Sequence, residues 1–340
     1  MGEYLHKAYE YASAENDAKK SESRENILEK LISFSKYGET HYLLKILGIK
    51  FKFPQKGIRE KRKSSPYYYY KNHNIDITTL PPAKGLLRDL QLASLKLLEE
   101  LDYVCEQAGL VYWLDGGTLL GAIRHKGFIP WDDDIDTAML REDYIRLKDA
   151  FEKYSRNNDI YVDYYRSARN SCNCYLRVMH RKCRDIFVDI FPWDDYGKSL
   201  SVVEQIKESS KIIKLRRLLE KECTKSKSNE FVISTVAKAM QEKVLINNKI
   251  LEEKSDFVWG IDFSHPWKNW FTKYDVLLPL QKIEFEGKEY PCLNNPHDFL
   301  ERVYGDYMNY PKKLTCGHNI YREFTKEEQE IIKMIGDRNG

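Results

Sequence analysis

Residues 111–140 read VYWLDGGTLLGAIRHKGFIPWDDDIDTAML, and this stretch places a glycine turn shortly before a run of acids. Val111–Leu114 predicts a short buried strand, after which Gly116 and Gly117 let the backbone approach an anionic ligand closely. We expect Thr118 to cap a following helix whose first amides face phosphate groups. A phosphate turn beside carboxylates is the combination that metal-assisted phosphoryl chemistry requires.

The acids Asp132, Asp134 and Asp136 share one side of an extended chain, because side chains on a strand alternate with period two. Three carboxylates on one side of a short segment repel one another unless a cation lies among them. Carboxylate oxygens are hard ligands, which suit Mg²⁺ or Mn²⁺. A solvated acidic loop is the alternative. Apolar neighbours such as Trp131 and Ile135 favour the metal site instead.

A calcium-binding helix–loop–helix motif also carries acids at its first, third and fifth positions. Its sixth position needs glycine for a sharp turn, and its twelfth needs a bidentate glutamate. Here these positions hold Thr137 and Asp143, and Pro130 stands where the entering helix should be ending. The sequence therefore favours catalysis over calcium binding.

The glycine turn and the acids are part of longer blocks that resemble the signature of the LicD family, bacterial phosphotransferases that decorate surface glycans and are related to fukutin and fukutin-related protein. The blocks are Gly117–His125, Gly127–Asp136, Phe187–Pro192, Phe285–Gly287, Tyr290–Pro291 and Tyr304–Met308. The resemblance implies an α/β fold of the nucleotidyltransferase (polymerase-beta-like) type, with a mixed sheet, helices and a helical insertion. It also implies transfer of a phosphorylated alcohol from a cytidine diphosphate (CDP) donor to a sugar hydroxyl.

We expect Asp134 and Asp136 to be the principal metal ligands, with Asp189 as a third carboxylate from a neighbouring strand. The strand Ile186–Ile190 is otherwise apolar, so its one acid needs a partner or a metal if it is buried. One or two Mg²⁺ would neutralise the donor pyrophosphate, and cytidine monophosphate would leave. Asp189 is also the candidate base for the acceptor hydroxyl, with Asp132 as the alternative.

A second group of residues is expected to bind the donor and its phosphates: Gly116, Gly117, Thr118, Arg124, His125 and Trp131. The charges of Arg124 and His125 follow the glycine turn closely enough to clamp phosphate oxygens. The alternative is a solvated helix end, where a cation is favourable in any protein. Asp133 is expected to support the acidic loop at the surface.

Composition indicates a soluble enzyme without a nucleic-acid partner. The 55 lysines and arginines nearly balance 52 acids, so no global field attracts nucleic acid. No apolar run approaches the ~20 residues of a membrane span, and the polar N-terminus lacks a secretory core. Seven scattered cysteines suit a reducing compartment, so we expect a cytoplasmic protein.

Two competing functions remain open. An enzyme on the same fold would transfer the nucleotidyl group and release pyrophosphate, and a scaffold would bind calcium without turnover. The transferred alcohol also stays open, because the many tryptophans and tyrosines permit either a choline cage or contacts to ribitol or glycerol.

Composition changes along the chain predict four regions: an N-terminal arm, residues 1–80; a catalytic core, 81–198; a helical insertion, 199–255; and a C-terminal part completing the cleft, 256–340. Residues 1–25 are polar and predict disorder or a frayed helix. Apolar residues from Ile27 to Ile49, followed by basic residues up to Lys63, have two interpretations. One is peripheral contact with the inner membrane beside a lipid-linked glycan acceptor, and the other is an accessory helix and hairpin.

One cluster of cysteines and a histidine has two interpretations, a zinc site or one face of a buried strand. Cys172, Cys174, His180 and Cys183 lack the paired Cys-x₂-Cys knuckles of common zinc sites. The alternation of these cysteines with Leu176 is typical of one buried strand face, which is the interpretation that we favour.

Overall fold

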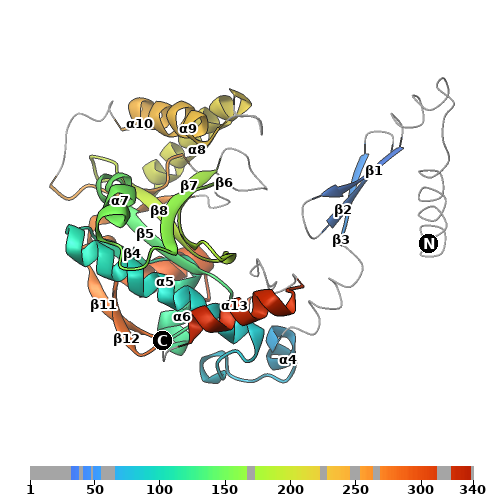
Figure 1. Ribbon diagram of the computed structural model, residues 1–340. Coiled ribbons are helices and arrows are strands. Elements are labelled where there is room, and N and C mark those ends of the chain that lie inside the picture. The colour runs from blue at the N-terminus through green and yellow to red at the C-terminus, as the bar shows by residue number, and fades with distance from the viewer. Residues whose placement is uncertain are drawn as a thin grey trace. The chain divides into compact units, whose positions relative to one another are not determined.

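The structure is a computed structural model of the chain (Figure 1). It describes residues 32–37, 41–46, 49–54, 66–166, 173–222, 228–245, 253–262, 269–311 and 323–337. The chain forms two compact units, residues 1–62 and 63–340. Helix α4 (Pro66–Asn72), within the region predicted as the N-terminal arm, belongs to the second unit. Its Tyr67 ring packs edge-on against Trp131, with the ring centroids 5.1 Å apart.

The first unit contains a three-stranded antiparallel sheet, formed by β1 (Ile32–Tyr37), β2 (His41–Ile46) and β3 (Ile49–Pro54). Consecutive strands pair along their full length, from Ile32 with Ile46 and from Ile46 with Ile49. Part of the expected arm is thus a small sheet rather than a helix with a hairpin. The predictions for residues 1–25 and for the basic residues before Lys63 fall outside the described residues.

The second unit is built on a mixed seven-stranded sheet, which confirms the predicted fold class. Its strands are β4 (Tyr112–Leu114), β5 (Ile135–Leu140), β6 (Ile160–Arg166), β7 (Cys174–His180), β8 (Cys183–Asp195), β9 (Phe257–Trp259) and β10 (Phe271–Thr272). The order β10-β9-β8-β5-β4 runs across the sheet, and β7 and β6 extend it from the first half of β8. Only β5 and β8 pair in parallel, while the other described pairs of this sheet are antiparallel.

Strand β8 lies in the middle of this sheet, and its central residues are mostly apolar. Residues Ile186 to Ile190 are all buried, as expected for a strand with neighbours on both edges and layers on both faces. Its one acid in this run, Asp189, is therefore enclosed by the fold rather than solvated.

Helix α5 (Leu86–Ala108) supports the sheet from one face. Its leucines recur with helical spacing, and Leu90, Leu97, Leu98 and Leu101 are buried as this spacing predicts. The helix ends at Gly109, whose φ of +63° is accessible to glycine at little cost. Helices α7 (Arg141–Tyr154) and α13 (Lys326–Gly336) pack on α5 and close this side of the core.

The segment 199–255 is helical where it is described. It contains α8 (Val202–Leu219), α9 (Asn229–Val232), a π-helical turn (Ile233–Ala237) and α10 (Lys238–Val244). Ser201 begins α8 with a capping box, in which its side chain and that of Glu204 satisfy each other's backbone amides. These helices share a second core with the β9–β10 edge of the sheet, formed by residues such as Met240 and Phe271.

The remaining elements follow the sheet in sequence: α11 (Tyr274–Leu277), β11 (Gln281–Phe285), β12 (Lys288–Cys292) and α12 (Pro296–Tyr304). Strands β11 and β12 form a separate two-stranded hairpin. Among the described residues, no helix combines the length and the apolar character that crossing a membrane requires.

Candidate active site

Helix α6 (Gly116–His125) begins at the glycine turn, directly after β4. Its N-cap is Asp115, which accepts a hydrogen bond from the Gly116 amide at 2.9 Å, so the expectation that Thr118 caps the helix is wrong. Asp115, rather than Thr118, is the N-cap because it stands immediately before the first helical residue, where a carboxylate reaches the free amides. The Thr118 hydroxyl instead accepts the Asp136 amide at 2.8 Å and fastens α6 to β5.

The two glycines let carboxylates, rather than phosphates, lie against the start of α6 in this structure. Gly116 has a φ of +51°, and a Cβ built on it would be 2.6 Å from Asp136 Oδ2. A Cβ on Gly117 would be 2.9 Å from Asp132 Oδ2, and the Gly117 amide donates to Asp136 Oδ2 at 3.1 Å. The turn therefore fixes the acids at the helix N-terminus, where negative charge is favourable.

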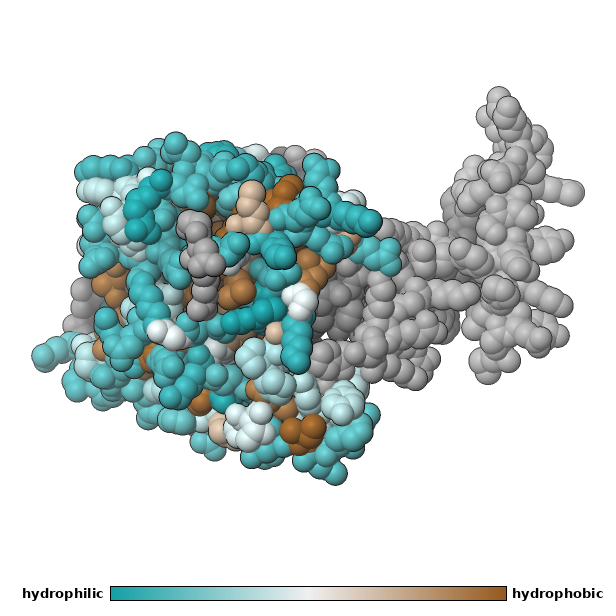
Figure 2. All heavy atoms as spheres, turned by 60° about the horizontal axis from the view of Figure 1, so that its bottom comes forward, coloured by the Kyte–Doolittle hydropathy of each residue, from teal (hydrophilic) through white to brown (hydrophobic). Residues whose placement is uncertain are grey.

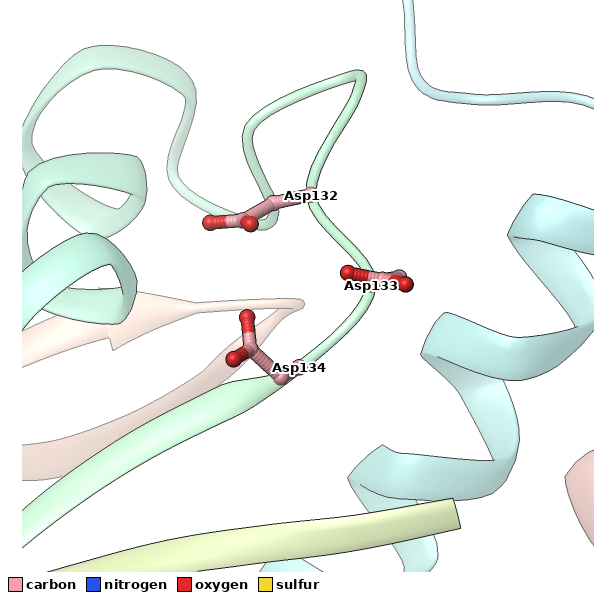
Figure 3. Close-up of side chains that lie close together, drawn as sticks. All are labelled: Asp132, Asp133 and Asp134. Carbon is pink, nitrogen blue, oxygen red and sulfur yellow. The ribbon is translucent and has the colours of Figure 1, made fainter. Parts of the chain in front are cut away.

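The acids Asp132, Asp133 and Asp134 lie in the loop before β5, each offering an oxygen within 4.8 Å of the others. Figure 3 shows Asp132 and Asp134 reaching to the same side of the loop, with their carboxylates facing each other. All three are buried, so the expectation that Asp133 lies at the surface is wrong. Buried Gln91 holds the loop by donating to the Asp132 carbonyl at 2.8 Å.

A second group of acids joins two strands. Asp136 of β5 and Asp189 of β8 are direct partners in the parallel register, so both carboxylates emerge on one face of the sheet. Together with Asp134 they offer three oxygens within 4.8 Å of one another. Burial, followed by the charges of Asp134 and Asp189, raises the pKa of Asp136 well above its ordinary value.

The structure thus brings together the three expected metal ligands. Carboxylate oxygens at this spacing suit a hard divalent ion such as Mg²⁺, and the raised pKa of Asp136 reflects a site that favours a positive charge. The acids lead into the extended strand β5 rather than into a calcium-binding loop and its exit helix. This geometry agrees with an open catalytic site better than with the calcium alternative.

Arg177 is a site residue that sequence reasoning missed. It lies opposite Asp189 in the β7–β8 register, and its Nε and Nη2 atoms donate to both Asp189 oxygens, Nη2 at 3.1 Å. Its guanidinium stacks on the rings of Tyr165 and Phe187, 3.5 and 3.7 Å from their centroids. The Tyr175 hydroxyl also donates to Asp189, at 3.3 Å. The predicted need of Asp189 for a partner is therefore met by an arginine within the chain.

Tyr304, the last residue of α12, is a second residue without a predicted catalytic role. Burial and the charges of Asp136, Asp115 and Asp132 raise its pKa well above 10. Tyr304 is 44% exposed as a whole residue, so part of its surface is open to solvent. Its family-like block was the sequence signal that pointed to it.

Two of the three remaining expected donor contacts lie at the far end of α6. At about 1.5 Å per residue, Arg124 and His125 stand roughly 12 to 14 Å along the helix axis from Gly116. Arg124 donates to the Tyr307 carbonyl at 3.0 Å. Trp131 is buried and packs on Tyr67 and Tyr310. Phosphate contacts for Arg124 and Trp131 remain predictions.

The cationic role of His125 remains a prediction, which the surroundings of its ring do not favour. Both ring nitrogens are buried, and neither has a hydrogen-bond partner among the described residues. Burial, together with the charge of Arg124, lowers the pKa of His125 from 6.5 to about 4. The ring is therefore neutral near pH 7 and carries no charge with which to clamp a phosphate.

The acidic loop is also held at its start by the β11–β12 hairpin. Glu286 accepts two hydrogen bonds from Arg88, at 2.9 and 2.6 Å, and a third from the Phe128 amide at 3.3 Å. A Cβ on Gly127 would lie 2.5 Å from Glu286 Oε1, so this glycine permits the close approach. The Glu286 side chain thus connects α5, the hairpin and the loop that carries the acids.

The cysteine cluster is consistent with the strand-face interpretation. Cys174 and Cys183 are buried at the ends of β7 and β8, whereas Cys172 lies outside the described residues. Burial raises the pKa of the Cys174 thiol to about 12. Among the described residues, no group of three metal-ligating side chains includes a cysteine.

Comparison with known proteins agrees with the residues that form this site. A family model described as "LicD/FKTN/FKRP, nucleotidyltransferase domain" matches residues 109–213. The chain is 31% identical over 248 residues to the lipopolysaccharide cholinephosphotransferase LicD of Haemophilus influenzae, which covers 67% of this chain and 93% of that protein. The chain belongs to the LicD family. The matched domain contains the acids of this LicD-family site and also Arg177.

Two further relatives match shorter parts of this LicD-family chain. The human ribitol 5-phosphate transferase FKRP is 58% identical over 40 residues, which are 12% of this chain and 8% of that protein. An uncharacterized protein of Rickettsia prowazekii is 33% identical over 97 residues, 28% of this chain and 33% of that protein.

Proposed function

We propose that this protein is a metal-dependent phosphotransferase that moves a phosphorylated alcohol from a CDP-linked donor to a sugar hydroxyl of a cell-surface glycan. The observation that carries the proposal is the group formed by Asp134, Asp136 and Asp189, which offers three oxygens within 4.8 Å on one face of the sheet. It is supported by two relatives whose names describe transfer of cholinephosphate and of ribitol 5-phosphate.

In this mechanism Asp134, Asp136 and Asp189 would hold Mg²⁺ or Mn²⁺. The bound ion supplies Lewis-acid stabilisation of the charge that develops on the donor phosphates. Gly116 and Gly117 keep the start of α6 free of side chains, so that donor phosphates would be able to approach this helix end closely. Arg177 pairs with Asp189 through both of its oxygens and fixes the orientation of its carboxylate.

The acceptor oxygen attacks the phosphorus that carries the alcohol, and the bond from this phosphorus to cytidine monophosphate breaks. Asp132 is the base that we propose for the acceptor proton, because both oxygens of Asp189 already accept hydrogen bonds from Arg177. The raised pKa of Tyr304 keeps its hydroxyl protonated, so it would donate a hydrogen bond to a phosphate oxygen within its reach.

The identity of the alcohol follows from a donor panel. Purified protein with Mg²⁺ and a glycan acceptor is given CDP-choline, CDP-ribitol or CDP-glycerol, and cytidine monophosphate is measured. We expect release with one donor, and none with Asp134→Asn, whereas Asp149→Asn, at an exposed position of α7, keeps wild-type release. Release of pyrophosphate from a nucleoside triphosphate would favour the nucleotidyltransferase alternative. We place the reaction in the cytoplasm as part of the same proposal.

A further inference from the structure

Three tryptophans of the second unit bring polar N–H groups into its core. Trp113 and Trp193 are almost fully buried, and Trp259 is 8% exposed. In contrast, the described part of the face in Figure 2 is mainly hydrophilic, with apolar residues in small groups. A buried indole N–H usually donates to an acceptor nearby, because an unpaired one is costly. Two of these three indoles share one acceptor at the candidate active site.

The shared acceptor is the carboxylate of Asp115, which is itself 2% exposed. Its Oδ2 atom accepts hydrogen bonds from the indole of Trp193 at 3.3 Å and from that of Trp259 at 3.2 Å. Its Oδ1 atom accepts the Gly116 amide at 2.9 Å. Among the described residues, no cationic side chain pairs with this carboxylate. All three partners donate, so the environment suits a carboxylate, which only accepts hydrogen bonds.

Asp115 also lies directly beside the strand that carries the expected metal ligands. Its amide donates to the Asp136 carbonyl at 3.0 Å. The Gly117 amide, two residues later, donates to Asp136 Oδ2 at 3.1 Å, and a Cβ on Gly116 would lie 2.6 Å from the same oxygen. A shift of the glycine turn would therefore move the groups that hold the Asp136 carboxylate.

The two indoles come from central strands of the sheet. Trp193 lies on β8, four residues after Asp189 and on the same face of that strand. Trp259 lies on β9 and is the register partner of Trp193. The Asp115 carboxylate thus ties the start of α6 to the strand that carries Asp189 and to the next strand of the sheet.

We propose that Asp115 is a positioning residue of the metal site, which holds the glycine turn against Asp136 while the two indoles hold Asp115. It acts through Asp136 rather than as a ligand, because it belongs to neither of the acid groups that lie close enough to share an ion among the described residues. Partners of this kind orient metal ligands and affect metal affinity without touching the ion. The inference rests on the metal-binding part of the proposed function and not on the transfer reaction.

The first test compares two tryptophan variants of the full chain by calorimetric titration with Mn²⁺. Trp259→Phe removes one donor to Asp115 and keeps a ring in the core. Trp113→Phe is the matched control, since the Trp113 indole nitrogen is buried without a hydrogen-bond partner among the described residues, and its ring lies 5.7 Å from that of Trp193. We expect Trp259→Phe to bind Mn²⁺ at least about threefold more weakly than Trp113→Phe.

The second test separates positioning from helix capping and from stability. Asp115→Ser keeps a side chain that caps helices well but is too short to accept from the indoles. Met240→Ala, in the second core, is the control for lost stability away from the acids. We expect Asp115→Ser to bind Mn²⁺ at least about tenfold more weakly than Met240→Ala, at a temperature where thermal unfolding shows both to be folded.

The outcomes distinguish this inference from the function on which it rests. Equal Mn²⁺ affinity within either pair of variants, while the wild type binds the ion, would overturn the positioning role of Asp115 and leave the metal site in place. A wild type that does not bind Mn²⁺ would overturn the metal site and the inference together.

Discussion

Arg177 and Asp189 are register partners on β7 and β8, and they form a buried ion pair at the edge of the carboxylate group. The arginine compensates the charge of one of three acids whose oxygens lie within 4.8 Å of one another. The positive charge of Arg177 thus offsets part of the cost of burying the Asp189 carboxylate in the middle of β8.

Replacing Arg177 tests this compensation. Arg177→Met leaves Asp189 buried without its cation, so we expect the free energy of unfolding to fall by about 3 kcal/mol. Arg177→Lys keeps the charge and should lose less. Because a metal ion can replace the missing charge, Mn²⁺ should raise the melting temperature of Arg177→Met more than that of the wild type. Equal stabilisation by Mn²⁺ in both proteins would show that Arg177 and the metal act on separate groups.

Replacing Gly116 tests the close approach of the carboxylates to α6. In Gly116→Ala the new Cβ would press against Asp136 Oδ2, so we expect Mn²⁺ affinity to fall at least about tenfold. Gly85→Ala is the matched control, since Gly85 also has a positive φ, +61°, but nothing lies within 4 Å of its Cβ position. Calorimetric titration should therefore show normal Mn²⁺ binding by Gly85→Ala. Similar affinity in the two variants would contradict the packing role of Gly116.

The pH dependence of stability tests the burial of His125. The pKa of His125 is lowered from 6.5 to about 4. Below pH 6.5 this imidazole therefore binds a proton in the unfolded chain but not in the folded protein. Stability is therefore lost as pH falls from about 7 toward about 4, by up to about 3 kcal/mol from this group. We expect His125→Leu to lose less stability than the wild type between about pH 7 and about pH 5 in urea unfolding. Parallel losses would mean that the ring can take up a proton in the folded state.

A double-mutant cycle tests the Arg88–Glu286 contact that holds the acidic loop. Arg88→Met and Glu286→Met should show a coupling energy above about 1 kcal/mol, because the pair is bidentate and largely buried. The exposed pair of Lys126 and Glu284, 2.9 Å apart, is the control and should couple by less than about 0.5 kcal/mol. A weak coupling at Arg88 would leave the loop without this support.

Local patterns were sufficient to predict much of the fold. The leucine spacing predicted α5, the apolar run predicted β4, and the acids predicted a carboxylate group before and within β5. These signals are local, since helical spacing and strand alternation are visible within one segment. The sequence could likewise indicate that Asp189 needs a partner, because an acid in an apolar strand is costly if it is buried alone.

The partner itself could not be read in this way. Arg177 meets Asp189 only through the pairing of β7 with β8. Such contacts depend on register and packing rather than on spacing within a segment. The burial of His125, which lowers its pKa, is likewise a property of the folded chain and is not visible from its position after the glycine turn.

The central claim is that the phosphate next to the alcohol is transferred by the group of Asp134, Asp136 and Asp189. The most direct measurement uses a CDP-alcohol labelled in that phosphate and follows the label into the glycan with Mg²⁺ present. We predict that the wild type moves the label and releases unlabelled cytidine monophosphate, and that Asp136→Asn is at least ~10²-fold slower while remaining folded. Label that stays with the nucleotide, or an Asp136→Asn variant with wild-type transfer, would contradict the account.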